Sequence, residues 1–260
     1  MTTWRWVDGD LVPADDVAGP LRVADSWRHV EGRVRRWDLH RDRFTAATSA
    51  LGHDRADVDA FLDAVARAVP ETGEWFPRVR LVADTLLLDV REGPPRKTEA
   101  VVHVLSPGDP RAQPRTKGPD LARLGVLIEE ARAGGADEIL LRDEQGRILE
   151  AGYAALVWWE DDVLFAPAAD LPLLPSVTRR VVTDHARREG VVVREVTAPI
   201  DALSGREAWL LNAYQGLRIV TAWSGVDIAA GPATHARRWR AALEGDSAFG
   251  PRPVRPSPRT

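Results

Sequence analysis

Residues 137–159, DEILLRDEQGRILEAGYAALVWW, decide how the rest of the chain is interpreted. Apolar residues at both ends of this stretch predict two strands joined by a polar turn. Glu150 falls where the second strand should enter the core, and a buried carboxylate without a cationic partner costs roughly several kcal/mol or takes up a proton. We therefore expect a cationic group opposite Glu150. The small residues that follow are expected to leave room for it: Ala151, Gly152, Ala154 and Ala155.

The composition is that of an ordinary globular protein with room for one large domain or two modest ones. The chain has 260 residues, of which 44% are hydrophobic and 28% charged. A formal net charge of −4 argues against a nucleic-acid-binding protein. No apolar run approaches the ~18 residues of a membrane span, and the N-terminus lacks the apolar core of a secretory signal.

Cysteine is absent, and the six histidines show no metal-binding spacing. We therefore expect no disulfides, no thiol chemistry and no metal centre. We expect a cytoplasmic location.

All but two of the 35 Lys and Arg residues are Arg. A guanidinium stays protonated, so Arg cannot form a Schiff base with a carbonyl compound, whereas a lysine amine can. The two lysines therefore deserve separate attention. Lys97 lies in the polar run REGPPRKTEA and is interpreted as a surface charge. Lys117 lies in RTKGPDL, next to other candidate site residues, and is interpreted as a reactive amine.

The sequence predicts an α+β protein with two domains. Residues 1–105 form a small N-terminal domain with helices over 39–51 and 57–69. The Pro-rich residues 106–116 form a linker, and residues 117–247 form a larger domain that opens with a helix over 121–133. Residues 248–260, rich in Pro and Arg, are predicted to be a disordered tail. Trp158, Trp159 and Trp209 are expected in the core.

Four features along the chain point to one cofactor. Lys117 offers an amine, and Glu150 follows it by 33 residues as a carboxylate. The stretch LPSVTR, 174–179, places backbone N–H groups at a helix start, and DLHRDRF, 38–44, offers His40 and Arg43 on one helical face. Pyridoxal 5′-phosphate (PLP) requires three contacts from a protein. These are an amine for its aldehyde, a carboxylate for its pyridinium nitrogen, and a helix start with an Arg for its phosphate. The protonated ring nitrogen is then the expected partner of Glu150.

These motifs resemble the class IV aminotransferases, the fold-type IV PLP enzymes that include branched-chain and D-amino-acid aminotransferases and aminodeoxychorismate lyase. The resemblance runs from EGRVRRWDLHRDRF to LNAYQGLRIVTAW, most of the chain. It covers the lysine of RTKGPDL, the motif DEILLRDEQGRILE that ends at Glu150, the phosphate loop LPSVTR, the HxxR helix and the turn NAYQG.

The resemblance implies a role for each matching residue. Lys117 is the catalytic residue. The residues that contact the cofactor are Arg43, Glu150, Val177, Thr178, Asn212 and Ala213. Weaker expectations place Ser26, Trp27 and Tyr214 at the substrate, and His40 is expected to pack or to support its neighbours. The resemblance also implies a homodimer that acts on a small amino substrate, with no nucleic acid or membrane as partner.

The sequence departs from the family on the substrate side. The family motif GDGxFE is replaced by GPLRVADSW, so an aromatic residue that borders the cofactor is missing near Ala24. The usual Ser-Asn after the cofactor carboxylate is Ala154-Ala155 here. Three functions are therefore open: an aminotransferase, a 4-amino-4-deoxychorismate lyase that releases pyruvate and 4-aminobenzoate, and a catalytically inactive scaffold.

Overall fold

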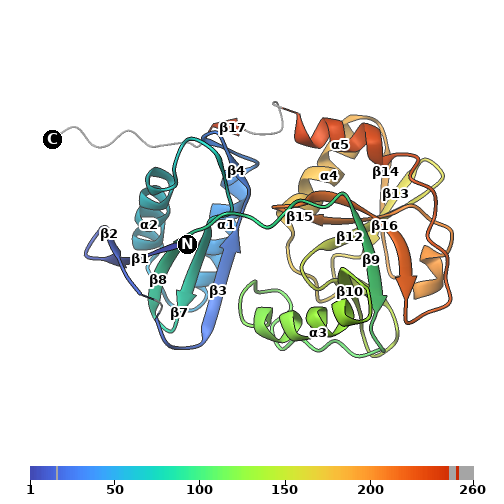
Figure 1. The fold of residues 1–260 in the computed structure, drawn as a ribbon, viewed down its shortest axis with the longest axis horizontal. Helices are drawn as coiled ribbons and strands as arrows, with labels where there is room; N and C mark the ends of the chain where they lie inside the picture. Colours follow the sequence, from blue (N-terminus) through green and yellow to red (C-terminus); the bar gives the residue numbers. More distant parts are fainter. Residues whose placement is uncertain (16, 246–249, 252–260) are drawn as a thin grey trace. The chain divides into compact units, whose positions relative to one another are not determined.

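The computed structural model describes residues 1–15, 17–245 and 250–251, and the chain divides into two compact units. Unit 1 comprises Met1–Pro95, Thr116–Pro119 and Asp246–Thr260; unit 2 comprises Arg96–Arg115 and Asp120–Gly245. Both units combine sheets with helices, as Figure 1 shows. The chain therefore passes from one unit to the other four times, and the segment that carries Lys117 belongs to unit 1 although both of its flanks belong to unit 2.

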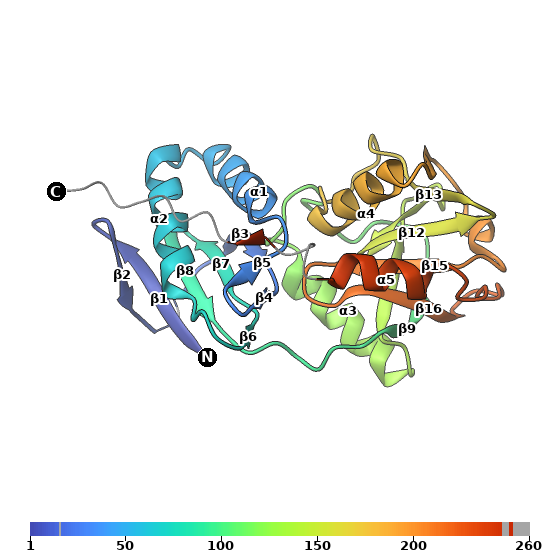
Figure 2. The same ribbon diagram turned by 90° about the horizontal axis from the view of Figure 1, so that it is seen from above.

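A five-stranded antiparallel sheet is the frame of unit 1. Its strands, in spatial order, are β2 (Asp10–Pro13), β1 (Thr2–Val7), β8 (Thr85–Val90), β7 (Arg78–Val82) and β3 (Leu21–Ser26). A smaller sheet has the order β17 (Gly250–Pro251), β5 (Arg33–Val34), β4 (His29–Val30) and β6 (Glu74–Trp75). Two helices, α1 (Trp37–Ser49) and α2 (Arg55–Ala68), share one core with the larger sheet, in which Phe44, Phe61 and Leu88 are buried (Figure 2).

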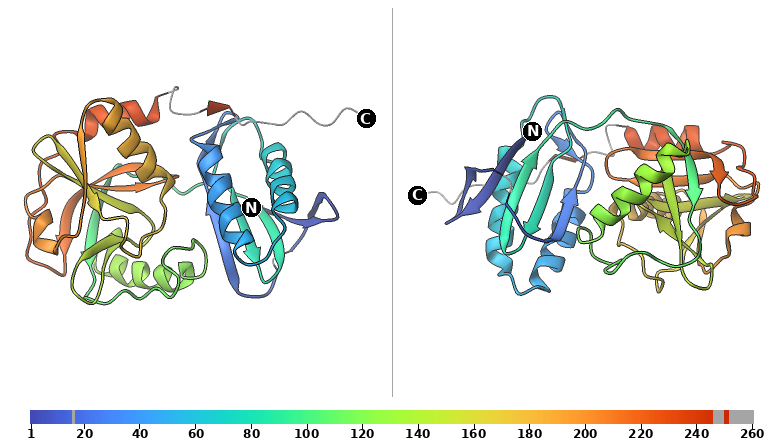
Figure 3. Two further views of the ribbon diagram at one scale, coloured as in Figure 1. Left: turned by 180° about the vertical axis from the view of Figure 1, so that it is seen from behind. Right: turned by 60° about the horizontal axis from the view of Figure 1, so that its bottom comes forward.

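An eight-stranded mixed sheet is the frame of unit 2. Its strands, in spatial order, are β11 (Ile148–Ala151), β10 (Glu138–Arg142), β9 (Glu99–Val104), β16 (Gly216–Ser224), β15 (Ala208–Asn212), β12 (Ala155–Glu160), β13 (Val163–Pro167) and β14 (Val192–Val196). The helix α3 (Leu121–Ala133) packs on β10 and β11. The helices α4 (Val177–Arg188) and α5 (Ala236–Glu244) pack together elsewhere on the sheet, and η1 (Ile200–Leu203) is a short 3-10 turn (Figures 1 and 3).

The predicted helices are confirmed to within two residues at each end. The helix expected over 121–133 is α3, and those expected over 39–51 and 57–69 are α1 and α2. Helix α2 begins at Asp54, whose carboxylate accepts hydrogen bonds from the N–H groups of Ala56 and Asp57, as an N-cap should. Among the described residues, no helix has the length and apolar character needed to cross a bilayer.

The stretch 137–159 forms three strands rather than the predicted two. The expected second strand breaks after Ala151, and Gly152–Ala154 separate β11 from β12. A Cβ on Gly152 would lie 3.0 Å from atoms of Ile128 and Ile139, so the small residue is required by the packing of α3 on β10. Ala154 and Ala155 are likewise buried among apolar neighbours. The space beside these residues is filled by the core, which corrects the expectation that they leave room for a partner of Glu150.

The predicted domain limits differ from the two units. Residues 96–105 were expected in the N-terminal domain, but β9 lies inside the sheet of unit 2, in parallel with both β10 and β16. Parallel partners far away in the sequence leave no local signal. The predicted linker 106–116 lies in unit 2 up to Arg115, where the carboxylate of Asp120 accepts hydrogen bonds from the N–H groups of Ala112 and Gln113. The predicted tail, 248–260, lies outside the described residues apart from the two that form β17.

Asp89 holds three partners in the sheet of unit 1. It is fully buried, and its carboxylate accepts hydrogen bonds from Arg78 Nε at 2.7 Å, Arg80 Nη2 at 2.8 Å and Thr3 Oγ1 at 3.1 Å. Burial alone would raise the pKa of Asp89, but the hydrogen bonds and charges of the two arginines outweigh it and lower the pKa below its ordinary value. The carboxylate therefore ties β1, β7 and β8 together in its ionised form.

Asp89→Asn should destabilise unit 1 by about 3–5 kcal/mol at pH 7, because two arginines lose their buried anion. A lowered pKa means that this stabilisation is present above the unfolded-state pKa and is lost as the pH falls through the folded-state value. The difference between wild type and variant should therefore shrink towards acidic pH in urea unfolding. Asp84→Asn is the control, because this carboxylate is 83% exposed in the turn of the same hairpin. A constant difference at every pH would contradict the assignment.

Candidate active site

The segment that carries Lys117 lies along β3 in unit 1. The carbonyl oxygen of Lys117 accepts a hydrogen bond from the N–H of Ala24 at 2.7 Å. Gly118 has a φ of +138°, and a Cβ there would lie 2.9 Å from backbone atoms of Ala24 and Val23. Only glycine fits this conformation and this close approach. The lysine backbone is therefore fixed against the strand in which the family's aromatic residue is replaced by Ala24.

The next residue of β3, Asp25, is fully buried and organises a cluster of side chains. Its carboxylate accepts hydrogen bonds from Arg43 Nε and Nη2, both at 2.8 Å, and from His40 Nδ1 at 2.9 Å. Burial would raise the pKa of Asp25, but the charges of Arg43 and His40 and their hydrogen bonds outweigh burial and leave the pKa well below its ordinary value. Asp25 is therefore ionised and fixes the orientation of Arg43.

His40 is held by its hydrogen bond to Asp25. Burial lowers the pKa of His40 below its ordinary value; the charge of Asp25 opposes this shift, while those of Arg43 and Lys117 add to it. Because an ionised Asp25 can only accept, the Nδ1 of His40 donates. The ring packs against Trp27 at 6.1 Å between centroids. The geometry favours the predicted packing and supporting role of His40.

Glu150 lies buried in β11 of unit 2, with a cationic partner supplied by the chain itself. Its Oε1 accepts hydrogen bonds from Arg111 Nη1 at 2.5 Å and from the N–H of Leu174 at 2.7 Å. Among the described residues nothing donates to Oε2, which leaves this oxygen available to a ligand. Burial raises the pKa of Glu150, and the charge of Arg111 opposes that shift. The expected cation is therefore present, but it is Arg111 rather than only a cofactor nitrogen.

Arg111, which the sequence analysis did not single out, lies beside the predicted site residue Glu150. Its guanidinium donates to Asp109 at 2.9 Å and to the carbonyl oxygen of Pro172 at 2.8 Å, in addition to Glu150. It lies in the stretch interpreted as a linker because of its prolines. The usable signal was an acid-x-Arg pair, Asp109 and Arg111, just before Lys117, since a solvated linker has no need of such an orienting pair.

The stretch LPSVTR forms the N-terminus of α4. The side chain of Ser176 caps the helix by accepting from the N–H of Arg179 at 3.2 Å. Val177 and Thr178 are buried, and in the described part of the chain no group accepts a hydrogen bond from their backbone N–H groups. Free N–H groups at a helix start, together with the helix dipole, favour an anion such as a phosphate. Leu174, at the head of the same stretch, is bonded to Glu150.

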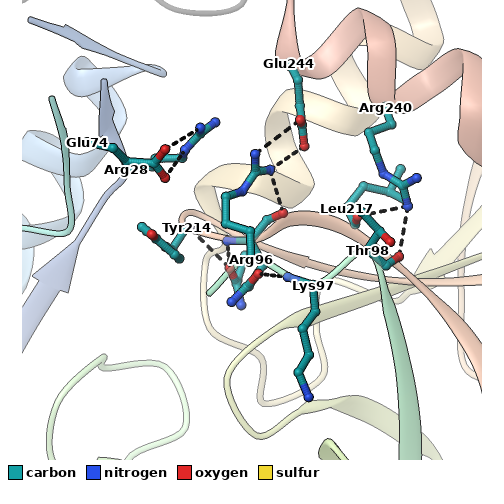
Figure 4. Close-up of polar contacts among 11 residues, drawn as sticks. Arg28, Glu74, Arg96, Lys97, Thr98, Tyr214, Leu217, Arg240 and Glu244 are labelled. Atoms are coloured by element: carbon teal, nitrogen blue, oxygen red, sulfur yellow. Dashed lines mark hydrogen bonds and ion pairs between the residues drawn. The ribbon is translucent and has the colours of Figure 1, made fainter. Parts of the chain in front are cut away.

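The turn NAYQG, which connects β15 to β16, is held from two sides. Asn212 Oδ1 accepts hydrogen bonds from the N–H groups of Tyr214 and Gln215. Arg96 donates to the carbonyl oxygen of Gln215 at 3.1 Å and forms an ion pair with Glu244 at the end of α5, as Figure 4 shows. Helix α5 therefore fixes the turn on which Asn212 and Ala213 lie.

The residues expected at the substrate are all largely buried. Trp27 is 2% exposed and packs edge-on against Trp37, which favours a core role over the predicted substrate contact. Ser26 lies beside Asp25 and accepts a hydrogen bond from Arg91 at 3.4 Å. Tyr214 is 6% exposed in the turn of unit 2.

Other sequence interpretations are confirmed. The indoles of Trp158, Trp159 and Trp209 are buried in the core of unit 2. Lys97 is 61% exposed and paired with Asp137, as expected of a surface charge.

The predicted site residues thus form two groups. Unit 1 brings together Lys117, Arg43, Ser26 and Trp27, and unit 2 carries Glu150, Val177, Thr178, Asn212, Ala213 and Tyr214. The donor set fits PLP on three counts. The chain offers an amine for the aldehyde, a free carboxylate oxygen for the ring nitrogen, and uncommitted N–H groups at a helix start for the phosphate.

Solved structures share this fold at low sequence identity. A branched-chain aminotransferase from Thermoproteus uzoniensis, solved with norvaline, superposes with a TM-score of 0.79 at 17% identity, over 96% of this chain and 99% of that one. A hypothetical aminotransferase from Mycobacterium tuberculosis, with α-ketoglutarate and pyridoxamine phosphate bound, gives 0.77 at 17% identity, over 94% and 99%. A candidate 4-amino-4-deoxychorismate lyase from Legionella pneumophila gives 0.73 at 16% identity, over 88% and 95%.

Among curated proteins, no sequence matches this chain. The model of the amino-transferase class IV family matches residues 22–223, which include every predicted site residue. The match spans most of the chain, and the α+β fold is that of the fold-type IV enzymes. The chain therefore belongs to the class IV aminotransferase family of PLP-dependent enzymes.

Proposed function

We propose that this protein is a PLP-dependent aminotransferase for a small amino acid or related amine, with Lys117 as its catalytic residue. The observation that carries the proposal is the state of Glu150. One oxygen of this buried carboxylate is held by Arg111 and Leu174, and the other is free to contact a pyridine nitrogen. An ionised carboxylate oxygen can only accept a hydrogen bond, so the second oxygen suits a ligand that carries an N–H, such as a protonated pyridine ring.

Each residue then has a definite task. Bound PLP supplies the electron sink that makes the Cα proton of the amino substrate acidic. Lys117 holds the cofactor through its Nζ, and after the substrate displaces it, the free amine moves that proton. Glu150 Oε2 keeps a proton on the ring nitrogen. Burial raises the pKa of Glu150, and the charge of Arg111 opposes this rise and so favours the ionised form.

The phosphate is expected at the start of α4. The N–H groups of Val177 and Thr178 donate to it, and Asn212 and Ala213 lie on the turn that completes its binding site. Arg43 is the expected cation. Asp25 accepts hydrogen bonds from two nitrogens of Arg43, so the guanidinium is fixed in one orientation before the phosphate binds.

A lyase is the second candidate, because a candidate aminodeoxychorismate lyase shares the fold. Both reactions begin with the same proton abstraction by Lys117. They differ in whether the proton returns to the cofactor or a β-substituent leaves. The catalytically inactive scaffold is disfavoured, because the lysine and the carboxylate are both present and Glu150 keeps one oxygen free.

A homodimer in the cytoplasm is part of the proposal. The family assembles its sites with help from a neighbouring subunit, and the absence of cysteine is compatible with a reducing compartment. Size-exclusion chromatography with light scattering tests the oligomeric state.

Product analysis separates the two candidate reactions. Purified holoenzyme should convert an amino acid to its 2-oxo acid only when a 2-oxo acid acceptor is supplied. Pyruvate and 4-aminobenzoate released from aminodeoxychorismate without an acceptor would show the lyase instead. No product in either assay would contradict both.

Borohydride reduction of the PLP-loaded protein should leave a pyridoxyl mark on the peptide that contains Lys117. The chain has only two lysines, so mass mapping gives an unambiguous answer. Lys117→Ala should lose the absorption band of the bound cofactor and at least about 10³-fold in kcat. Lys97→Arg is the matched control and should retain both. A mark on Lys97, or substantial turnover by Lys117→Ala, would overturn the assignment.

Arg111→Gln should move the acidic limb of the pH–rate profile to higher pH. Burial already raises the pKa of Glu150, and without the opposing charge of Arg111 the carboxylate stays protonated to a higher pH. The loss in kcat should therefore be greatest below neutral pH and recover as the pH rises. Glu150→Gln should lower kcat by about 10²-fold at every pH.

Arg115→Gln is the control for Arg111→Gln. This residue lies in the same segment, but within the described part of the chain it donates only to the carbonyl oxygen of Asp170. A profile for Arg111→Gln that merely falls in height, with its acidic limb unmoved, would show that Arg111 does not tune Glu150.

A further inference from the structure

Two carboxylates hold the backbone around Arg111. The N–H of Arg111 itself donates to Asp109 Oδ1 at 3.0 Å. The next two N–H groups, of Ala112 and Gln113, donate to Asp120 Oδ1 and Oδ2, both at 2.9 Å. An ionised carboxylate can only accept, so both oxygens of Asp120 suit these donors. Three consecutive N–H groups of a Pro-rich stretch outside the strands and helices are therefore fixed by carboxylates.

Asp120 does not play the part expected of an acidic residue at a helix start. It is the N-cap residue of α3, but its side chain accepts no hydrogen bond from the first turn of that helix, all of which the structure describes. By contrast, Asp54 caps α2 in the usual way. Asp120 is 9% exposed, so its carboxylate is largely removed from water. Its hydrogen bonds serve the Arg111 stretch rather than the helix.

The two hydrogen bonds to Asp120 close a short loop that contains Lys117. Gln113 and Asp120 are the ends of this loop, and Lys117 lies four residues after the first and three before the second. Closing a flexible loop restricts the conformations that its residues can sample. Inside the loop, the carbonyl oxygen of Lys117 is also bonded to the N–H of Ala24. The lysine backbone is therefore constrained by the loop ends as well as by β3.

The helix start that carries Asp120 is fixed by a contact from the turn after Glu150. Tyr153 donates its hydroxyl to the carbonyl oxygen of Leu121 at 2.8 Å. A Cβ on Gly125, one turn further along α3, would lie 2.9 Å from the same hydroxyl oxygen. Glycine weakens a helix interior, and here it allows the tyrosine to reach the helix backbone. Asp120 thus lies on a helix start that is tied to the segment of Glu150.

Arg111 connects Asp120 to Glu150. The guanidinium of Arg111 donates to Glu150 Oε1 at 2.5 Å and to the carbonyl oxygen of Pro172 at 2.8 Å. A side chain keeps such a geometry only when the backbone that carries it is held in place. Asp120 bonds to the two residues that follow Arg111, so its effect on Glu150 passes through that arginine.

We propose that Asp120 is a positioning residue of the active site, which fixes the backbone of Arg111 and closes the loop that carries Lys117. The cation that faces Glu150 and the reactive amine then depend on one carboxylate. This role rests on the proposed PLP-dependent function, because it concerns the residues that would hold the cofactor. Loss of the Asp120 carboxylate should disturb both Arg111 and Lys117, whereas loss of the Arg111 guanidinium should leave the loop closed.

Amide hydrogen exchange, followed by NMR, tests the two hydrogen bonds in the full chain without cofactor. Asparagine keeps one acceptor oxygen and replaces the other with an NH2 group that cannot accept. In Asp120→Asn, the amide of Ala112 or of Gln113 should therefore exchange at least about tenfold faster than in wild type. Asp54→Asn makes the same change at the start of α2 and should leave both amides unaffected. Unchanged exchange in Asp120→Asn would overturn the proposal.

The acidic limb of the pH–rate profile reports on Arg111. When the backbone of Arg111 is loosened, its charge opposes the rise in the pKa of Glu150 less strongly, so the limb of Asp120→Asn should move to higher pH. The charge of Arg179 also opposes this rise and is the same in every variant. In Asp120→Asn/Arg111→Gln, the limb should lie where it lies in Arg111→Gln alone, because both changes act through one guanidinium. Additive shifts would contradict the proposal.

Titration of the full chain with PLP, followed by absorption, reports on Lys117. Asp120→Asn should bind PLP at least about tenfold more weakly than wild type, since the loop that presents the amine is no longer closed. Asp120→Ser separates this role from helix capping. Serine is a good N-cap residue, but it has one short hydroxyl in place of two carboxylate oxygens. Asp120→Ser should therefore bind PLP as weakly as Asp120→Asn, and wild-type affinity would show that Asp120 only begins the helix.

Ile128→Val is the structural control, because it removes one methyl group from the buried face of the same helix. It should leave the PLP affinity and the acidic limb as in wild type, and equal effects in Ile128→Val and Asp120→Asn would refute the positioning role. A wild type without a pyridoxyl mark on Lys117 would overturn the proposed function and this role with it. A marked wild type with unaltered PLP affinity in Asp120→Asn would overturn this role alone.

Discussion

The ion pair between Glu150 and Arg111 is the interaction on which the site of unit 2 depends. It joins three segments that are distant in the sequence: the Pro-rich stretch before Lys117, the strand β11 and the loop that leads into α4. A carboxylate this deeply buried would otherwise take up a proton, and a protonated Glu150 could not keep a proton on a pyridine nitrogen. The arginine that opposes this protonation also engages Oε1 and leaves Oε2 without a donor among the described residues. Stability and chemistry thus require the same contact.

Unit 1 also contains a buried carboxylate that is held by cationic side chains. Asp25 occupies the position next to the missing aromatic residue. Its carboxylate accepts hydrogen bonds from Arg43 and His40 rather than from solvent. The cluster orients the guanidinium before any ligand arrives, which lowers the entropy lost on binding. The departure from the family motif near Ala24 therefore leaves the polar framework intact while it removes an aromatic wall. A change of substrate is the expected consequence of such a pattern.

Local patterns predicted the helices and the spacing of the motifs, because capping residues and apolar periodicity act over a few residues. They placed α3 correctly, and they identified Glu150 as a carboxylate in need of a cation. They failed where partners are remote. The strand β9 was assigned to the wrong side of the boundary because its parallel neighbours lie far along the chain. Arg111 was overlooked since nothing in a Pro-rich stretch shows that it folds back onto β11.

The path of the chain between the two units has a consequence for its synthesis. The edge of β3 keeps the N–H of Ala24 unpaired until Lys117 has been made, and β5, which already pairs with β4, obtains its second partner only when Gly250 and Pro251 emerge. The first 95 residues therefore leave the ribosome as an incomplete domain with two open strand edges. N-terminal domains commonly fold as units while the rest of the chain is still being made. Here completion of the first unit waits for Gly250 and Pro251, so a late part of the chain helps to fold an early one.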